Sequence, residues 1–101
     1  MKEMEIRTTN VFDTWFAKLR DHNAKARIQV RIKRLARGNP GQTRTLTDGV
    51  QEMKIDYGPG YRVYFTERKG LIFVLLIGGD KTTQTEDIKR AIVVAKALED
   101  A

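Results

Sequence analysis

The fold is decided by residues 50–77, which read VQEMKIDYGPGYRVYFTERKGLIFVLLI. Runs rich in β-branched and aromatic residues alternate here with the turn-forming stretches 58–60 and 68–70, and this alternation predicts strands. The strands are expected at Val50–Asp56, Tyr61–Glu67 and Leu71–Ile77. Because such short connections cannot hold the crossover that parallel neighbours need, the strands are predicted to run antiparallel, as a meander.

Two further strands are predicted outside this stretch. Arg44–Thr47 precedes the meander and is separated from it by Asp48 and Gly49, a turn-forming pair. Met4–Arg7 alternates apolar and polar residues near the start of the chain. Leu71–Ile77 is apolar at successive positions, so both of its faces are expected to be buried and the strand is predicted to lie inside the sheet.

Helical spacing precedes the meander. Apolar residues at helical intervals predict a first amphipathic helix, with its aromatic side chains in the core. Its stripe consists of Phe12, Trp15, Phe16 and Leu19. Residues 8–10 supply capping side chains, and Asn10 with Asp13 is the expected capping pair. A second helix is predicted from Ala24 to Ala36, ending at Gly38.

The second helix also carries a run of basic residues. These are Lys25, Arg27, Arg31, Lys33, Arg34 and Arg37. Such a run fits contacts with phosphates or with an acidic protein segment, and it equally fits a solvated helix face. The sequence leaves these alternatives open. His22, the single histidine of the chain, precedes this helix and is expected in a turn or a cap.

A third helix is predicted near the end of the chain. Thr83 and Glu86 have capping-box spacing, and an apolar stripe follows them. The stripe consists of Ile88, Ala91, Ile92, Ala95 and Leu98. Residues 58–60 and 78–79 are glycine-rich but lack the spacing and the lysine of a phosphate-binding loop, so both are interpreted as turns.

These elements predict an α+β protein with a small, mostly antiparallel sheet. With 101 residues, the chain is expected to form one domain over residues 1–101. Since each helix is apolar on one side only, the simplest packing places the two N-terminal helices and the C-terminal helix on one face of the sheet. The other face is then expected to be open.

Composition narrows the classes of function. Lysine and arginine number 19 against 13 acidic residues, a net charge of +6 that favours polyanionic partners such as nucleic acid or an acidic protein. The chain has no cysteine and no serine, which excludes disulfides, thiolate metal sites, cysteine nucleophiles and a serine triad. No metal site and no cofactor are predicted. Without a signal-like or membrane-spanning apolar run, a cytoplasmic location is expected.

The candidate site follows from the alternation of side chains along the strands. Odd positions such as Met53 and Val63 are assigned to the core. The even positions that share the open face are Glu52, Lys54, Arg62 and Tyr64. Metal-independent cleavage of a phosphodiester needs cations that stabilise the developing negative charge, a base for the ribose 2′-OH and an acid for the leaving 5′-oxygen. A solvated face with cross-strand ion pairs explains the same pattern, and both readings stay open.

Several motifs along the chain resemble a known family. They are residues 49–54 (GVQEMK), 58–65 (GPGYRVYF) and 75–81 (LLIGGDK), followed by Gln84, Asp87 and Ile88. In order and spacing they are similar to the HigB-type addiction-module killer branch of the RelE/ParE toxin superfamily. The resemblance covers the whole chain and implies a RelE-like fold. It also implies a bacterial type II toxin that cleaves mRNA, commonly on the ribosome, and that is neutralised by a helix-turn-helix antitoxin.

The resemblance also implies roles for individual residues. Lys54 and Arg62 match the basic strand residues around the scissile phosphate, and Lys81 matches a basic residue after the last strand that contacts phosphate. No histidine or aromatic residue follows Phe73, whereas RelE and several relatives have one there for proton transfer. The acid and the base are therefore unassigned among three candidates, Glu52, Tyr64 and Asp80.

Two other functions stay open, the first of them because of the same departure. One is a ParE-like toxin that inhibits DNA gyrase without cleaving RNA. The other is a nucleic-acid-binding module without catalysis, which would need the positive charge but has no use for a division between a buried and an open sheet face.

Overall fold

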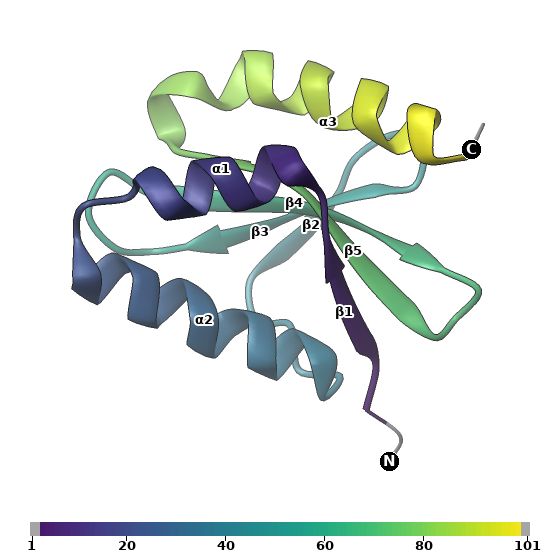
Figure 1. The fold of residues 1–101 in the computed structure, drawn as a ribbon, viewed down its shortest axis with the longest axis horizontal. Helices are drawn as coiled ribbons and strands as arrows, with labels where there is room; N and C mark the ends of the chain where they lie inside the picture. The colour runs from purple at the N-terminus through teal and green to yellow at the C-terminus, as the bar shows by residue number, and fades with distance from the viewer. Residues whose placement is uncertain (1–2, 100–101) are drawn as a thin grey trace.

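A computed structural model describes residues 3–99, without the side chain of Glu99, and it has the α+β architecture of a RelE-like fold. The first two and last two residues of the predicted domain lie outside the described residues. The elements are β1 (Glu5–Thr8), α1 (Asn10–Lys18), α2 (His22–Ala36), β2 (Thr43–Thr45), β3 (Val50–Ile55), β4 (Tyr61–Arg68), β5 (Ile72–Gly79), the 3₁₀ helix η1 (Lys81–Thr83) and α3 (Gln84–Glu99). In Figure 1, α3 runs along the top of the view and α2 along the bottom, with the strands between them.

The strands form one five-stranded sheet in the order β1-β5-β4-β3-β2. Strands β2 to β5 are antiparallel neighbours, which confirms the predicted meander. Strand β1 pairs in parallel with β5, so β5 lies inside the sheet, as its apolar sequence predicted. The register between β4 and β5 shifts between Tyr64 and Phe65, where a β-bulge accommodates Leu76.

One face of the sheet is covered by the two N-terminal helices. Helix α1 packs on β5 and α2 packs on β3. The odd-numbered apolar residues of β3 and β4 face these helices, as predicted, and form an apolar core with them. The buried members of this core are Phe12, Ala24, Ile28, Leu35, Met53, Ile55, Tyr61, Val63, Phe65, Phe73 and Leu75.

The other face is covered by α3, and the prediction that all three helices share one face is wrong. A second core lies between α3 and the sheet, and its buried members are Val50, Tyr64, Leu76, Ile77, Ala91 and Ala95. The even positions of the strands were interpreted as a polar surface. Val50 and Tyr64 at two of these positions, together with Ile77 beyond the β-bulge of β5, instead make an apolar patch, and burying such a patch requires a helix.

The two glycines at the end of β5 allow helices to pack closely on both faces of the sheet. Residues 58–60 form a turn as predicted, but Gly78 and Gly79 are the last residues of β5. A Cβ on Gly78 would lie 2.2 Å from the Trp15 ring, and one on Gly79 would lie 1.8 Å from the Asp87 carboxylate. Helices α1 and α3 therefore approach β5 from opposite faces at positions where only glycine fits.

The helix caps differ in detail from those predicted. Thr9, rather than the pair Asn10 and Asp13, caps α1, and its side chain accepts a hydrogen bond from the Phe12 N–H at 3.1 Å. The capping box near the C-terminus joins Asp80 and Thr83 and starts η1, so the predicted pairing of Thr83 with Glu86 is wrong. In each case the cap lies upstream of the predicted position, where the chain is still extended.

Helix α2 begins at His22, directly after its N-cap residue Asp21. Asp21 caps it by accepting hydrogen bonds from the N–H groups of Asn23 and Ala24. Throughout residues 3–99, no helix combines the length and the apolar character needed to cross a membrane.

Candidate functional site

A polar hollow of about 460 Å³ lies where β2, β3 and β4 meet the start of α3. Its lining residues are Gln42, Thr43, Arg44, Glu52, Lys54, Arg62 and Gln84. Three of the side chains predicted from strand parity, Glu52, Lys54 and Arg62, are therefore brought together. The lining carries three cations and one carboxylate, which makes the hollow electropositive.

Strand register builds the hollow. Glu52 lies opposite Arg44 on β2 and opposite Tyr64 on β4, so these three residues form one row across the sheet. Lys54 lies opposite Arg62 in the next row on the same face. The predicted pairing of even positions with even positions is thus confirmed. It places the two cations Lys54 and Arg62 in one row and the carboxylate of Glu52 in the neighbouring row.

Glu52 is buried, with 6% of its side chain exposed, and its carboxylate is held from two sides. Arg44 Nη2 lies 3.2 Å from Glu52 Oε1. Gln84 Nε2 donates a hydrogen bond of 2.9 Å to Glu52 Oε2. A buried carboxylate is stable only with such partners, so Arg44 and Gln84 keep Glu52 in place at the floor of the hollow.

Arg62 is also buried, with 7% of its surface exposed. Its Nη1 donates a hydrogen bond of 2.6 Å to the carbonyl oxygen of Gly60, whereas its Nε, which is buried, has no partner. Among the described residues, no carboxylate lies within ion-pair distance of Arg62. Since arginine does not lose its charge in proteins, the hollow holds a cation that the protein itself leaves uncompensated.

Lys54 lies beside Arg62 and is half-buried. Its backbone is fixed on both sides: its N–H donates to the Gln42 carbonyl at 3.0 Å, and its own carbonyl accepts a bond of 2.7 Å from Arg31 on α2. Its ammonium group forms no ion pair within residues 3–99. Two neighbouring cations of the hollow, Lys54 and Arg62, are thus available to an anion.

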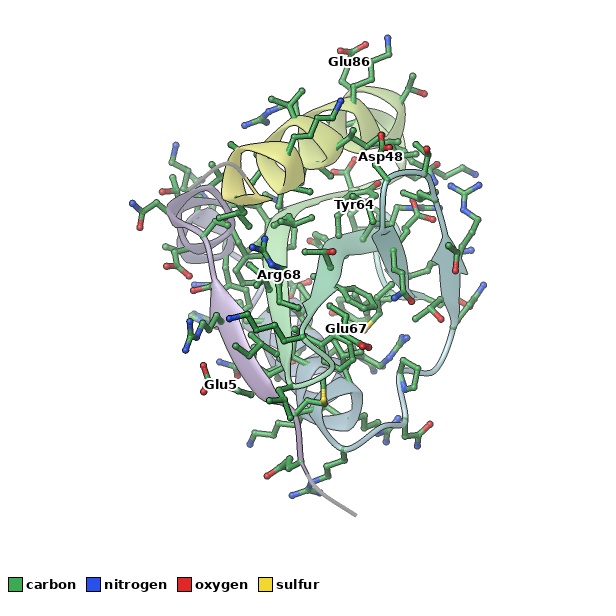
Figure 2. The ribbon with its side chains drawn as sticks, turned by 90° about the vertical axis from the view of Figure 1, so that its right-hand side faces the viewer. Glu5, Asp48, Tyr64, Glu67, Arg68 and Glu86 are labelled. Atoms are coloured by element: carbon green, nitrogen blue, oxygen red, sulfur yellow. The ribbon has the colours of Figure 1, made fainter. Side chains whose placement is uncertain are left out.

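Tyr64 is not on an open face, and that prediction is wrong. Its side chain is completely buried against α3, on the side of the sheet that Figure 2 shows beneath the helix. Its hydroxyl has no hydrogen-bond partner in the described part of the chain. Burial, reinforced by the negative charge of Glu52, raises the pKa of this phenol well above its ordinary value.

Lys81 and Asp80 follow β5 and lie outside the lining of the hollow. The Lys81 N–H donates to the carbonyl of Pro59 at 3.4 Å, so the exposed Lys81 is next to the turn that holds Arg62. The Asp80 carboxylate accepts hydrogen bonds from the N–H and the hydroxyl of Thr82 at 2.8 and 2.5 Å. Asp80 is therefore occupied as a helix cap, whereas Lys81 is free to contact a ligand at the rim.

The basic run on α2 has several local structural roles. Arg31 donates to the carbonyl of Pro40 at 2.9 Å and so fixes the segment that leads into β2. Lys25 lies over the ring of Phe16 and Arg27 over the ring of Tyr57. Arg31, Lys25 and Arg27 thus have structural roles in the fold. The remaining members, Lys33, Arg34 and Arg37, are exposed on the side of the sheet opposite the hollow.

Sequence reasoning gave no site role to Arg44, Gln84 and Asp87, although the last two are among the motif residues of the family resemblance. Arg44 lies opposite Glu52 because β2 spans Thr43–Thr45 and pairs with β3 in this register. The predicted strand Arg44–Thr47, with a two-residue turn at Asp48 and Gly49, would instead have placed Arg44 opposite Met53. Gln84 and Asp87 come from α3, which was placed on the wrong face. Asp87 is buried, and it accepts a hydrogen bond from the Thr83 hydroxyl at 2.5 Å. Within residues 3–99, no group of three or more metal-ligating side chains is placed to hold a metal ion.

Comparison with known proteins gives two matches. The family described as phage derived protein Gp49-like (DUF891) matches residues 14–98. An uncharacterized protein of Haemophilus influenzae is 48% identical over 95 residues, which cover 94% of this chain and 96% of the relative. No solved structure matches the chain. The family match includes all seven residues that line the hollow.

Proposed function

The chain belongs to the Gp49-like family, an addiction-module toxin family related to the RelE and HigB types, and from this we propose that it is a HigB-type toxin that cleaves mRNA. The proposed reaction is metal-independent and takes place in the polar hollow. The family implies an antitoxin partner. We propose further that this antitoxin carries a helix-turn-helix domain, that the mRNA is cut on the ribosome and that the toxin acts in the cytoplasm.

One observation carries the proposal, namely the buried and uncompensated charge of Arg62. Burying a charge without a partner costs free energy, and an arginine cannot avoid this cost by losing its proton. A folded protein keeps such a group where a ligand supplies the missing countercharge. The guanidinium geometry fits two oxygens of a phosphate, and the unpaired Lys54 lies next to it in the same row.

The arrangement supports a division of roles. Glu52 takes the proton of the ribose 2′-OH, the 2′-oxygen attacks phosphorus, and the bond to the 5′-oxygen breaks to leave a 2′,3′-cyclic phosphate. Arg62 and Lys54 stabilise the charge that develops on the phosphate oxygens. Lys54 also supplies the proton to the leaving 5′-oxygen, because a lysine, unlike an arginine, can release one. Lys81 contacts a neighbouring phosphate at the rim.

Tyr64 and Asp80 receive no proton-transfer role in this proposal. The Tyr64 hydroxyl is enclosed between β4 and α3, and its raised pKa makes it a poor proton donor. The Asp80 carboxylate is occupied by Thr82. Glu52 is left as the base because it is the one carboxylate among the lining residues of the hollow.

The reaction is tested by primer extension on mRNA from cells that express the chain. We expect discrete cuts in phase with codons. Intact mRNA in growth-arrested cells would contradict the proposal. Inhibition of DNA gyrase in those same cells would then favour the ParE-like alternative.

The partner is tested separately by co-expression with a helix-turn-helix protein encoded beside the toxin gene. We expect that protein to restore growth and to co-purify with this chain, because a net charge of +6 favours an acidic partner segment. A neighbouring helix-turn-helix protein that neither restores growth nor co-purifies would contradict the proposed partner.

A further inference from the structure

The two partners of Glu52 differ in how firmly they are held. Arg44 lies on β2, a strand of three residues at the edge of the sheet that pairs with β3 alone. Its side chain is 57% exposed, whereas that of Glu52 is 6% exposed. The ion pair therefore joins a fixed carboxylate at the floor of the hollow to a guanidinium that reaches into solvent.

Gln84 holds the same carboxylate from the opposite side. It is the first residue of α3, directly after η1, and the Asp80 capping box fixes the start of η1. Its amide is half-buried and donates to Glu52 Oε2 at 2.9 Å, while the shorter contact of Arg44 is to Oε1. Glu52 thus has one partner on a well-anchored helix start and one on a short edge strand.

Resting on the proposed function, we infer that Arg44 is an exchangeable partner of Glu52. In the free protein Arg44 pairs with Glu52, and in the complex it turns to a phosphate of the bound RNA, while Gln84 stays in place as a positioning residue for Glu52. The exchange frees Oε1, which then accepts the proton of the 2′-OH. RNA binding therefore also frees the Glu52 carboxylate to act as the base.

Charge and geometry both favour this exchange. A phosphodiester entering the hollow meets three cations and a single carboxylate, so it competes directly with Glu52 for a guanidinium. Arg44 is the exposed member of the three, so its guanidinium can turn from Glu52 to a phosphate without being buried on the way. Glu52 keeps the Gln84 hydrogen bond on Oε2 after Arg44 leaves, so the carboxylate stays positioned while Oε1 is free to accept a proton.

The first experiment measures binding of a non-cleavable 2′-deoxy oligonucleotide as a function of salt. We expect Glu52→Gln to bind it about two- to fivefold more tightly than the wild type, because Arg44 no longer has to leave a carboxylate. Adding Arg44→Ala to Glu52→Gln should abolish this gain and reduce the slope of log K against log salt by about 0.7, the value for one lost phosphate contact on a single strand. The double variant leaves no buried carboxylate unpaired, so it is expected to fold.

The second experiment separates positioning from binding by steady-state kinetics. Gln84→Met keeps the length of the side chain but removes its donor, and we expect kcat to fall about tenfold with KM unchanged. Arg44→Lys keeps the charge and should retain more activity than Arg44→Ala. Arg20→Ala, the loss of an exposed arginine outside the hollow, is the matched control and should change neither constant.

The outcomes distinguish this inference from the proposed function. If the wild type cleaves RNA but Arg44→Ala leaves the salt slope of Glu52→Gln unchanged, the exchange is refuted and the nuclease stands. A Gln84→Met variant with wild-type kcat would refute its positioning role. Absence of any RNA cleavage by the wild type would instead refute the proposed function.

Discussion

The two faces of the sheet are built from the same strands but differ in what they bury. On the face covered by α1 and α2, the buried core consists of aromatic and aliphatic side chains, among them Phe65 and Phe73 with ring centres 5.5 Å apart. On the face covered by α3, the buried residues include two charged groups of the hollow, Glu52 and Arg62. Alternation along β3 and β4 sends one set of side chains to each face.

The two faces separate the residues that stabilise the fold from those that would act on a ligand. On the face under α1 and α2, the buried side chains are apolar and pack against one another. The face under α3 is apolar where the stripe from Ile88 to Leu98 meets the sheet, and it becomes polar where α3 begins. Substitutions on the first face should therefore affect folding, whereas substitutions in the hollow should affect activity.

The largest effect on folding is expected from Phe65→Ala on the apolar face. Phe65 is 1% exposed, and truncating a buried phenylalanine to alanine costs about 3–5 kcal/mol through lost burial and the cavity left behind. Urea denaturation measures the change. Val93→Ala on α3, where Val93 is 67% exposed, is the control and should change the free energy of unfolding by less than about 0.5 kcal/mol. Similar values for the two variants would remove the distinction between core and surface.

The largest effect on activity is expected from Arg62→Ala in the hollow. Removing a preorganised donor from a transition state typically lowers the rate by about 100- to 1,000-fold, or roughly 3–4 kcal/mol. Folding should persist, because the substitution removes a buried charge that has no countercharge. Arg62→Lys should recover part of the rate, since it restores charge without the two-pronged geometry.

The measurements for Arg62 are mRNA cleavage, growth of expressing cells and thermal melts by circular dichroism. Arg20→Ala, with the same change in net charge at an exposed position, should behave as the wild type. A folded Arg62→Ala protein that cleaves at the wild-type rate would exclude Arg62 from the chemistry. An unfolded Arg62→Ala protein would show that Arg62 is needed for folding, and the face under α3 would then contribute to stability as well as to activity.

An intermediate effect is expected where α1 approaches the sheet most closely. Gly78→Ala places a Cβ 2.2 Å from the Trp15 ring, and overpacking of this kind costs about 1–3 kcal/mol. Chemical denaturation of Gly78→Ala measures the cost, and combining it with Trp15→Phe, a smaller ring, should recover part of it. A Gly78→Ala variant with an unchanged free energy of unfolding would mean that α1 can move away from β5.

Much of this fold was predictable from the sequence, because the relevant signals are local. The meander follows from the short connections at residues 58–60 and 68–70, and β5 is interior because successive residues from Leu71 to Ile77 are apolar. The pairing of Lys54 with Arg62 follows from a hairpin in register. Each of these inferences uses residues a few positions apart or joined by a single turn.

The failures concern contacts between distant segments. Whether α3 lies on one face or the other depends on the small apolar patch of Val50, Tyr64 and Ile77, which alternation alone did not distinguish from a polar surface. That error placed Tyr64 in the open and hid Gln84, which contacts Glu52 across 32 positions of the chain. Gly78 was interpreted as a turn residue for a separate reason: its role, which is to admit the Trp15 ring, depends on a contact between α1 and β5, segments far apart in the sequence.

The smallest effect at neutral pH is expected from Tyr64→Phe, which tests whether this residue belongs to the packing or to the chemistry of its face. Its hydroxyl is buried without a partner, so losing it should change the free energy of unfolding by no more than about 1 kcal/mol at pH 7. If Tyr64 only packs against α3, the variant should cleave mRNA at the wild-type rate, unlike Arg62→Ala. A large loss of cleavage with an intact fold would give the hydroxyl a part in proton transfer.

The same variant should show a difference that grows in alkali. Burial raises the pKa of Tyr64 in the folded protein, so the unfolded chain loses this proton first as the pH rises above the ordinary tyrosine value of about 10. The contribution of Tyr64 to stability is therefore complete below that pH and is lost progressively above it, whereas phenylalanine has no proton to lose. Tyr61, whose pKa is also raised by burial, is present in both proteins and cancels in the comparison. Urea denaturation of the wild type and Tyr64→Phe at pH 7 and pH 11 should thus show the variant gaining relative stability at the higher pH. Parallel curves would mean that solvent reaches the hydroxyl and that α3 does not close this side of the sheet.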